Sequence, residues 1–253
     1  MITRCFKLAS LALFGAVLAL AAAPALAADT QVAVAANFTE PAKAIAAAFK
    51  AKTGHTATLS FGASGQFYTQ IAHGAPYEVF LSADAERPLK AEQEGLGVPG
   101  ARFTYAVGRL VLYSKTPGLV DTKGAVLGSG RFEKLAIADP TAAPYGEAAV
   151  ETMRKLKVYD AVAPKIVKGA SIAQAYQYVA TGNAELGFVA LSQVIDEPGG
   201  SRWLVPAADH APIQQQAVLL RTGEKNPAAR AFMTFLKSPA AVAIIKRYGY
   251  EVR

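Results

Sequence analysis

Short apolar runs alternate with amphipathic helical patterns along this chain from residue 31 onward. The first three pairs each begin with a run fit for a buried strand, at residues 31–35, 56–61 and 78–82, and continue into a helical pattern. In the first helical pattern the apolar residues share one helix face: Ala42, Ile45, Ala46 and Phe49. Consecutive strand-then-helix units place their strands in parallel, so the pattern predicts a parallel sheet with helices on its faces.

An extended run at residues 104–113 is too long to serve one small sheet. We interpret it as a crossing from one lobe of the protein to another. Beyond it the alternation resumes, with strands expected at 135–138 and 186–190 and helices at 146–156 and 171–181. The middle of the chain therefore predicts a second α/β unit.

A second extended run, at residues 214–220, is a plausible return strand. Two helical patterns follow it, at 227–237 and 239–248, and we expect both helices to pack on the first lobe. Two α/β lobes joined by two crossings are typical of a hinged ligand-binding protein with its cleft between the lobes. The predicted division is a first lobe of residues 28–105 and 214–253 and a second lobe of residues 106–213.

The first 27 residues have the order of a secretory signal peptide. Arg4 and Lys7 precede an apolar run at residues 8–23, and Ala25-Leu26-Ala27 is a small-x-small cleavage site. The run is short for an uncleaved membrane anchor, which is the alternative interpretation. We expect cleavage after Ala27, secretion into the periplasm and a mature chain without the only cysteine, Cys5.

The charge of the chain is modest and dispersed. The formal net charge is +7, and removal of Arg4 and Lys7 with the signal leaves +5. No dense basic block with interleaved aromatic residues is present, which argues against a nucleic-acid partner. No later run approaches about 18 apolar residues, so we expect no membrane insertion after cleavage.

Four turns that open predicted helices carry small or hydrogen-bonding residues and no charged ones. A helix N-terminus offers unpaired N–H groups and the positive end of the helix dipole, so these turns suit a desolvated anion held by neutral donors. Phosphate fits less well, because its proton usually requires a carboxylate acceptor. The turns are Ala36-Asn37-Phe38-Thr39, Gly62-Ala63-Ser64-Gly65, Ala143-Pro144-Tyr145-Gly146 and Ala170-Ser171-Ile172.

Each turn also has a purely structural interpretation. Asn37 and Ser64 are residue types that cap helices, as is Thr39 at the start of the first helix. Tyr145 is of a type that often packs half-buried. Ile172 has no polar side-chain atom, so only its backbone N–H can bind an anion. It is the recurrence of such turns in both lobes that favours the binding hypothesis.

The sequence resembles the periplasmic molybdate-binding proteins of ABC transporters, from Val32 to the C-terminus. The motifs that carry the resemblance are Val34-Ala35-Ala36-Asn37-Phe38-Thr39, Phe61-Gly62-Ala63-Ser64-Gly65-Gln66, the run from Gly74 to Asp84, Ala138-Asp139-Pro140 with Pro144-Tyr145-Gly146, Leu186-Gly187-Phe188-Val189 and Lys246-Arg247-Tyr248-Gly249-Tyr250. The resemblance implies a two-lobed periplasmic binding protein fold with parallel-rich sheets flanked by helices. It places the ligand contacts on Asn37, Ser64, Tyr145 and Ile172, with Ala36 as a backbone donor.

Two positions depart from many members of that family. Asn37 stands where those members have serine, and Ala190 stands where they have a tyrosine on the loop after Leu-Gly-x-Val. Tyr145 stands where they have a small residue, as in a second branch of the family, so we expect its hydroxyl to replace the missing phenol.

The function that the resemblance implies is capture of molybdate or tungstate and delivery to an inner-membrane permease. On this interpretation the protein is a monomer without a cofactor or a protein-ligated metal cation, and the molybdenum is bound as its oxyanion. Sulfate or another small anion on the same fold is the alternative. A secreted hydrolase is a more distant one, because Gly62-Ala63-Ser64-Gly65 lacks the G-x-S-x-G spacing, Asp84 and Asp139 are expected to cap turns, and His55 and His73 are expected at the surface.

Overall fold

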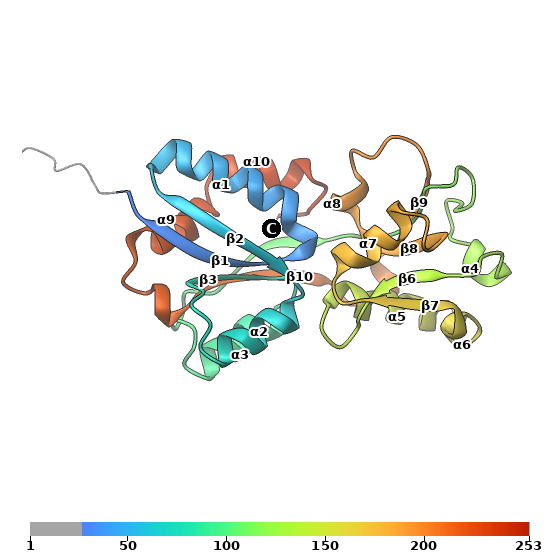
Figure 1. Ribbon diagram of the computed structural model, residues 1–253, viewed down its shortest axis with the longest axis horizontal. Coiled ribbons are helices and arrows are strands. Elements are labelled where there is room, and N and C mark those ends of the chain that lie inside the picture. The colour runs from blue at the N-terminus through green and yellow to red at the C-terminus, as the bar shows by residue number, and fades with distance from the viewer. Residues whose placement is uncertain (1–26, 253) are drawn as a thin grey trace, which may run out of the picture.

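The computed structural model describes residues 27–252, so the predicted signal peptide lies outside the described residues except for Ala27. The described chain forms two five-stranded sheets, each flanked by helices and lying end to end along the long axis of the molecule (Figure 1). We call each sheet with its flanking helices a lobe. The two-lobed α/β fold predicted from the sequence is confirmed.

The sheet of the first lobe has the strand order β2-β1-β3-β10-β4. β1 pairs in parallel with both β2 and β3, as the three strand-then-helix units predict, whereas β10 runs antiparallel to β3 and β4. The sheet is therefore mixed, because β10 returns from the second lobe in the opposite direction. Its strands are β1 (Asp29–Ala35), β2 (Thr56–Gly62), β3 (Val79–Ser82), β4 (Phe103–Gly108) and β10 (Ile213–Leu219).

Helices cover both faces of this sheet (Figure 1). Successive side chains of β1 point to opposite faces of the sheet, which explains why helices pack on both faces. Val32 and Val34 belong to one apolar cluster, and Ala33 belongs to the other. The first cluster includes Phe232 and Ile245 of the C-terminal helices, which confirms that these helices pack on the first lobe. The helices of this lobe are α1 (Thr39–Thr53), α2 (Ser64–Ala72), α3 (Glu86–Gln93), α9 (Pro227–Phe235) and α10 (Pro239–Arg247).

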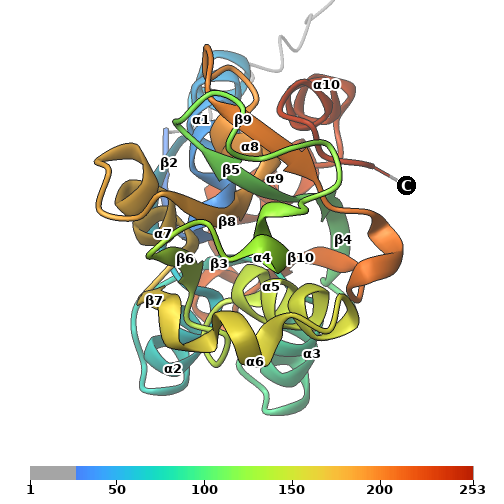
Figure 2. The same cartoon turned by 90° about the vertical axis from the view of Figure 1, so that its right-hand side faces the viewer.

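The sheet of the second lobe has the order β7-β6-β8-β5-β9, with α5 (Pro144–Lys155) and α7 (Ile172–Ala180) on opposite faces (Figure 2). β6 is parallel to β7 and β8, and β5 is antiparallel to β8 and β9. Three single-turn α-helices complete the lobe: α4 (Val126–Ser129), α6 (Tyr159–Val162) and α8 (Leu191–Val194). The strands are β5 (Leu110–Ser114), β6 (Leu135–Ala138), β7 (Ile166–Gly169), β8 (Leu186–Ala190) and β9 (Ser201–Leu204).

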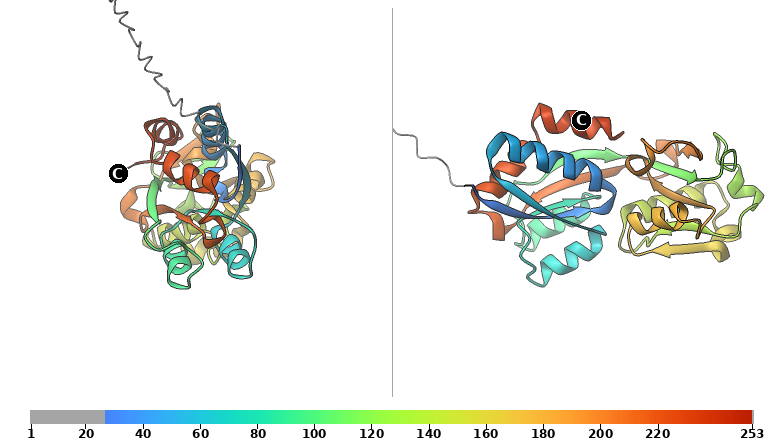
Figure 3. Two further views of the ribbon diagram at one scale, coloured as in Figure 1. Left: turned by 90° about the vertical axis from the view of Figure 1, so that its left-hand side faces the viewer. Right: turned by 45° about the horizontal axis from the view of Figure 1, so that its top comes forward.

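The chain changes sheets within the extended run predicted at residues 104–113. Gly108 still pairs with Ile213 in the first sheet, and Leu110 already pairs with Ala190 in the second. Arg109 is therefore the single residue between β4 and β5, and β10 provides the return (Figure 3). After α10 the chain comes back to this junction, where Glu251 bridges to Val107.

The expectations for Thr39 and His55 are wrong, whereas the expectation for Asp84 and Asp139 is confirmed. Thr39 begins α1 but does not cap it, because its Oγ1 donates to Ala36 O at 2.8 Å and a 3-10 turn, η1 (Ala36–Phe38), precedes the helix. His55 is buried and accepts a hydrogen bond from Ala28 N at Nδ1. Asp84 and Asp139 do cap turns, through the N–H groups of Arg87 and Thr141.

No single helix in residues 27–252 has the length and apolar character needed to cross a membrane. α9 and α10 meet that requirement only when taken together, and they are bent by 61° at the break between them. Both helices bury apolar residues in the core of the first lobe.

Candidate anion-binding site

The four turns singled out in the sequence meet at one small cavity between the lobes. The cavity is small, since its empty space amounts to about 200 Å³ even with the adjoining open solvent included. Every side chain in its lining is uncharged. The lining residues are Ala35, Ala36, Asn37, Gly62, Ala63, Ser64, Ala83, Ala143, Pro144, Tyr145 and Ile172.

Helices from both lobes begin at residues that line this cavity. Ser64 and Ile172 are the first residues of α2 and α7, and Tyr145 is the second residue of α5. N–H groups at these positions have no acceptor within their own helix. Pro144 supports this arrangement, because proline at the first helical position has no N–H and fixes φ for the helix. The positive ends of three helix dipoles therefore lie next to one uncharged cavity.

Ser64 adds a side-chain donor. Its side chain is buried, and Oγ accepts a hydrogen bond from Ala83 N at 2.9 Å. A hydroxyl accepts and donates at once, so this bond fixes the oxygen and leaves its proton available to an acceptor in the cavity.

The carboxamide of Asn37 is held by protein groups. Its Nδ2 donates to Gln215 Oε1 at 2.8 Å and to Tyr250 Oη at 3.0 Å, which uses both of its protons. The backbone carbonyl of Asn37 accepts from Ser192 Oγ at 2.7 Å. The backbone N–H is therefore the donor of Asn37 that is left to bind an anion. Ala36 comes before it in η1 and also lines the cavity.

Tyr145 lines the cavity, and its phenol extends toward the junction of the lobes. Its hydroxyl accepts from Gln215 Nε2 at 3.2 Å, and a Cβ at Gly108 would lie 2.2 Å from it. Neither Gln215 nor Gly108 is among the cavity residues. Ala190, where relatives carry a tyrosine, is fully buried and ends β8. The hydroxyl of Tyr145 thus has a protein partner outside the cavity lining, in Gln215.

Burial sets the ionisation of the phenols around Asn37. Desolvation raises the pKa of Tyr145 and of Tyr105 well above 10.0, and neighbouring phenols raise both further. The pKa of Tyr250 is raised to about 12, again mainly by desolvation. All three hydroxyls therefore keep their protons at neutral pH and add no negative charge beside the cavity.

The structure brings together all five residues expected from the sequence: Ala36, Asn37, Ser64, Tyr145 and Ile172. Sequence reasoning did not identify the residues behind them, namely Gln215, Tyr250, Tyr105 and Ser192. Tyr250 belongs to a motif of the family resemblance, but no local pattern assigned a role to any of the four, because their contacts depend on strands and helices that are distant in sequence.

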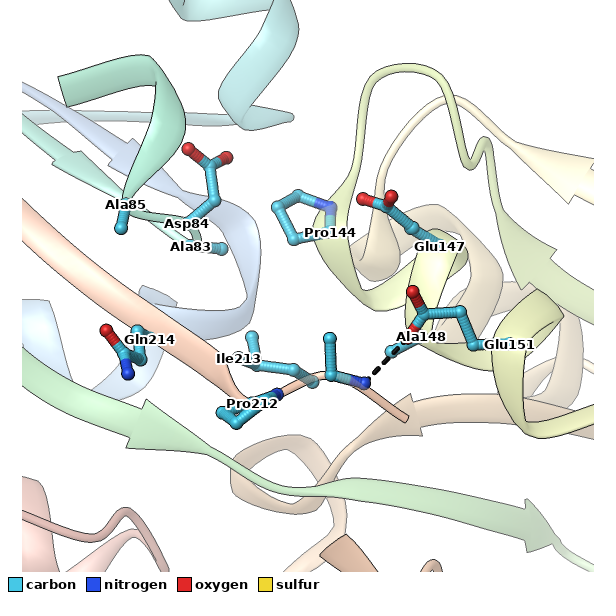
Figure 4. A pocket seen from close by; sticks show the side chains of 11 residues that line it. Ala83, Asp84, Ala85, Pro144, Glu147, Ala148, Glu151, Pro212, Ile213 and Gln214 are labelled. Carbon is cyan, nitrogen blue, oxygen red and sulfur yellow. Dashed lines mark hydrogen bonds between the residues drawn. The ribbon is translucent and has the colours of Figure 1, made fainter. Parts of the chain in front are cut away.

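A second cavity shares Ala83 and Pro144 with the first, but its chemistry is different. Figure 4 shows the side chains that line this second cavity. Its carboxylates come from both lobes: Asp84 after β3, and Glu147 and Glu151 on α5. Desolvation and then Glu151 raise the pKa of the Glu147 carboxyl. Asp84 is paired with Arg87, so Glu147 and Glu151 give this cavity its negative charge. That charge repels a dianion, so the electrostatics favour the smaller, uncharged cavity as the anion site.

Residues 30–251 match the family model described as bacterial extracellular solute-binding protein. The chain belongs to this family. It is 61% identical to the molybdate-binding protein ModA of Rhodobacter capsulatus and 57% identical to that of Azotobacter vinelandii, covering 90% and 92% of this chain and 90% and 94% of the relatives. A solved structure titled Azotobacter vinelandii periplasmic molybdate-binding protein superposes with a TM-score of 0.86 at 42% identity, covering 88% of this chain and 99% of the other.

Proposed function

We propose that this member of the solute-binding family is the component of an ABC importer that captures molybdate, or tungstate, in the periplasm and delivers it to the membrane permease. The observation that carries the proposal is the convergence of three helix N-termini and the Ser64 hydroxyl on one small, uncharged cavity. The names of the relatives at 57–61% identity support molybdate as the anion.

The donors in this site suit an anion that carries no proton. N–H groups of Asn37, Ser64, Tyr145 and Ile172, with Ala36 as a further backbone donor, would surround the oxyanion together with the Ser64 hydroxyl. No carboxylate belongs to the lining, so a protonated phosphate would find no charged acceptor for its proton. The molybdenum would remain inside its oxygen shell and would need no protein ligand of its own. No cofactor is required for such binding, and we propose no catalytic step.

Capture and release would come from movement of the lobes. Asn37 and Ser64 belong to the first lobe, and Tyr145 and Ile172 belong to the second, so only a closed cleft lets all of them bind one anion. We propose that the two lobes move as two units of a monomer, with the boundaries at Arg109 and at the start of β10 and not at 105/106 and 213/214, because residues 106–108 and Ile213 pair within the first sheet. Opening of the cleft at the permease would then release the anion.

A thermal shift assay of the mature protein, residues 28–253, tests this function. Molybdate and tungstate at about a hundred times their dissociation constants should each stabilise the protein by about 3 kcal/mol, because they bind only the folded state. Sulfate and phosphate at the same concentrations are the controls and should have little effect. Equal stabilisation by sulfate would contradict the assignment of molybdate as the ligand and leave the assignment of the fold unaffected. No stabilisation by any oxyanion would reject the function.

A further inference from the structure

Six buried polar side chains form a connected cluster at the junction of the lobes. Each is less than a tenth exposed, although together they carry four hydroxyls and two carboxamides. Buried polar groups of this kind destabilise a fold unless they are hydrogen-bonded. The cluster, which we call the hinge cluster, consists of Asn37, Tyr105, Tyr145, Ser192, Gln215 and Tyr250.

Tyr250 and Gln215 fix the orientation of Asn37. Both accept from Asn37 Nδ2, and Gln215 Oε1 also accepts from the Tyr105 hydroxyl at 3.0 Å. The single proton of Tyr250 can be donated to Asn37 O at 2.7 Å or to Ser192 Oγ at 2.9 Å. The carboxamide and the carbonyl of Asn37 are thereby both restrained, and with them the peptide that presents its N–H to the cavity.

Ser192 and Tyr145 are the members of the hinge cluster that come from the second lobe, and Ser192 is the one that contacts Asn37. Ser192 lies on α8, directly after β8, and its Oγ donates to Asn37 O at 2.7 Å. The bonds among Tyr250, Ser192 and Asn37 therefore link the second lobe to an anion-binding peptide of the first.

The C-terminal segment, residues 249–252, holds Tyr250 in this position. Glu251 bridges to Val107 of β4, and its carboxylate accepts from Arg109 Nη1 at 2.9 Å, at the residue where the chain changes lobes. Gly249 adopts φ +81°, and a Cβ there would lie 2.7 Å from Leu191 Cδ2 of the second lobe. Glycine adopts this conformation without strain, and any larger residue would also require Leu191 to shift.

From this geometry we infer that Tyr250 and Ser192 are positioning residues that couple anion binding to closure of the cleft, and that the C-terminal segment is the part of the first lobe that detects closure. The inference rests on the proposed function. When the lobes separate, Ser192 leaves Asn37 and water replaces it. When the lobes close, Ser192 completes the hinge cluster and Asn37 is held with its N–H toward the anion. The bonds from Ser192 form only in the closed state, so they raise the affinity for the anion by stabilising that state.

The experiment compares Tyr250→Phe with Tyr248→Phe. The first variant removes one hydroxyl and keeps the ring contact with Phe38, whose centroid lies 5.3 Å away. Tyr248 is in the same stretch of chain, half-buried and outside the hinge cluster, so its phenylalanine variant is the matched control. Calorimetry gives the dissociation constant for molybdate, stopped-flow measurement gives the dissociation rate, and thermal unfolding without ligand gives the Tm.

We expect Tyr250→Phe to weaken molybdate binding roughly threefold to tenfold, mainly through faster dissociation, as suits the loss of one neutral hydrogen bond. The ligand-free Tm of Tyr250→Phe should fall modestly, because its bonds with Asn37 lie within the first lobe and persist in the open form. The ligand-free Tm of Ser192→Ala should stay at the wild-type value, because the bond from Ser192 to Asn37 is absent from the open form. Ser192→Ala should act in the same direction, and the double variant should lose less than the product of the two single losses.

Two results would overturn the inference while wild-type binding stays intact. One is an unchanged dissociation constant in Tyr250→Phe. The other is a lowered ligand-free Tm of Ser192→Ala with unchanged affinity, which would make the cluster a fixed part of the fold in both states. Failure of the wild-type protein to bind any oxyanion is a different outcome, because it rejects the proposed function and this inference together.

Discussion

The hydroxyl of Ser64 is the side-chain donor whose position in the cavity is best defined. Its oxygen is fixed by Ala83 N, and the bond that it offers to a dianion is charge-assisted. Ser64→Ala should therefore weaken molybdate binding by about 1.5 to 3 kcal/mol, or roughly tenfold to a hundredfold, as measured by titration calorimetry.

The substitution also leaves Ala83 N without its acceptor, so some loss of stability is expected in the absence of ligand. Ser238→Ala is the control, because Ser238 likewise accepts from one backbone N–H, that of Ala241, but lies at the start of α10 and not at the cavity. It should lower the Tm and leave the affinity unchanged. A Ser64→Ala variant with wild-type affinity would remove this hydroxyl from the site.

The sequence and the structure lead to different expectations for the variant Tyr145→Phe. If the Tyr145 hydroxyl replaces the phenol that is missing at Ala190, as the sequence suggests, Tyr145→Phe should lose about as much affinity for molybdate as Ser64→Ala. The structure directs the hydroxyl toward Gln215 and Gly108, so we expect Tyr145→Phe to lose less than tenfold in the same calorimetric assay. A loss of a hundredfold would show that the hydroxyl binds the anion and would restore the sequence-based expectation.

Elements with a strong local signal could be predicted well from the sequence. The strands at 135–138 and 186–190 have the predicted bounds, because each is a short, fully buried apolar run. β7 and β9 were not predicted, since they are short edge strands with exposed lysine or arginine, and only pairing with β6 and β5 makes them strands. The site residues likewise divide into those with a local sequence signal and those without one. The helix starts have local signals, but nothing near Gln215 or Tyr250 in the sequence indicates that they meet Asn37.

The start of α2 shows how closely the two lobes approach. Gly65 N donates to Ala142 O at 2.9 Å across the cleft, and a Cβ at Gly65 would lie 3.0 Å from Ala142 Cα. Gly65→Ala should therefore hinder closure and weaken molybdate binding roughly tenfold or more, because backbone on both sides would have to move. Calorimetry with molybdate checks this expectation.

Gly128→Ala is the matched control for that substitution. Gly128 lies in α4, with open space where a Cβ would be added, so its variant should bind as the wild type does. The ligand-free Tm of Gly65→Ala should also match the wild type, since the crowding arises only when the lobes meet. An unchanged affinity for Gly65→Ala would mean that the closed cleft can adjust without loss.

For the molecule as a whole, the structure corresponds to a closed cleft. Bonds between the lobes lie on both sides of the anion cavity, from Gly65 N to Ala142 O and from Ser192 Oγ to Asn37 O. Without an anion, a closed cavity would hold several N–H groups with no acceptor beside the positive ends of three helices, which costs free energy. Opening would hydrate those groups, so the ligand-free protein should favour an open form, with bending near Arg109 and at the start of β10.

Solution X-ray scattering of the mature protein measures this change directly. Saturating molybdate should lower the radius of gyration of the wild type, and sulfate at the same concentration should leave it at the ligand-free value. Gly65→Ala should compact less than the wild type at equal saturation, because its added methyl group keeps the lobes apart at Ala142. If calorimetry shows tight molybdate binding and the scattering curve does not change, the cleft is already closed without ligand. Affinity would then arise from a preformed cavity, and the hinge at Arg109 would have no part in capture.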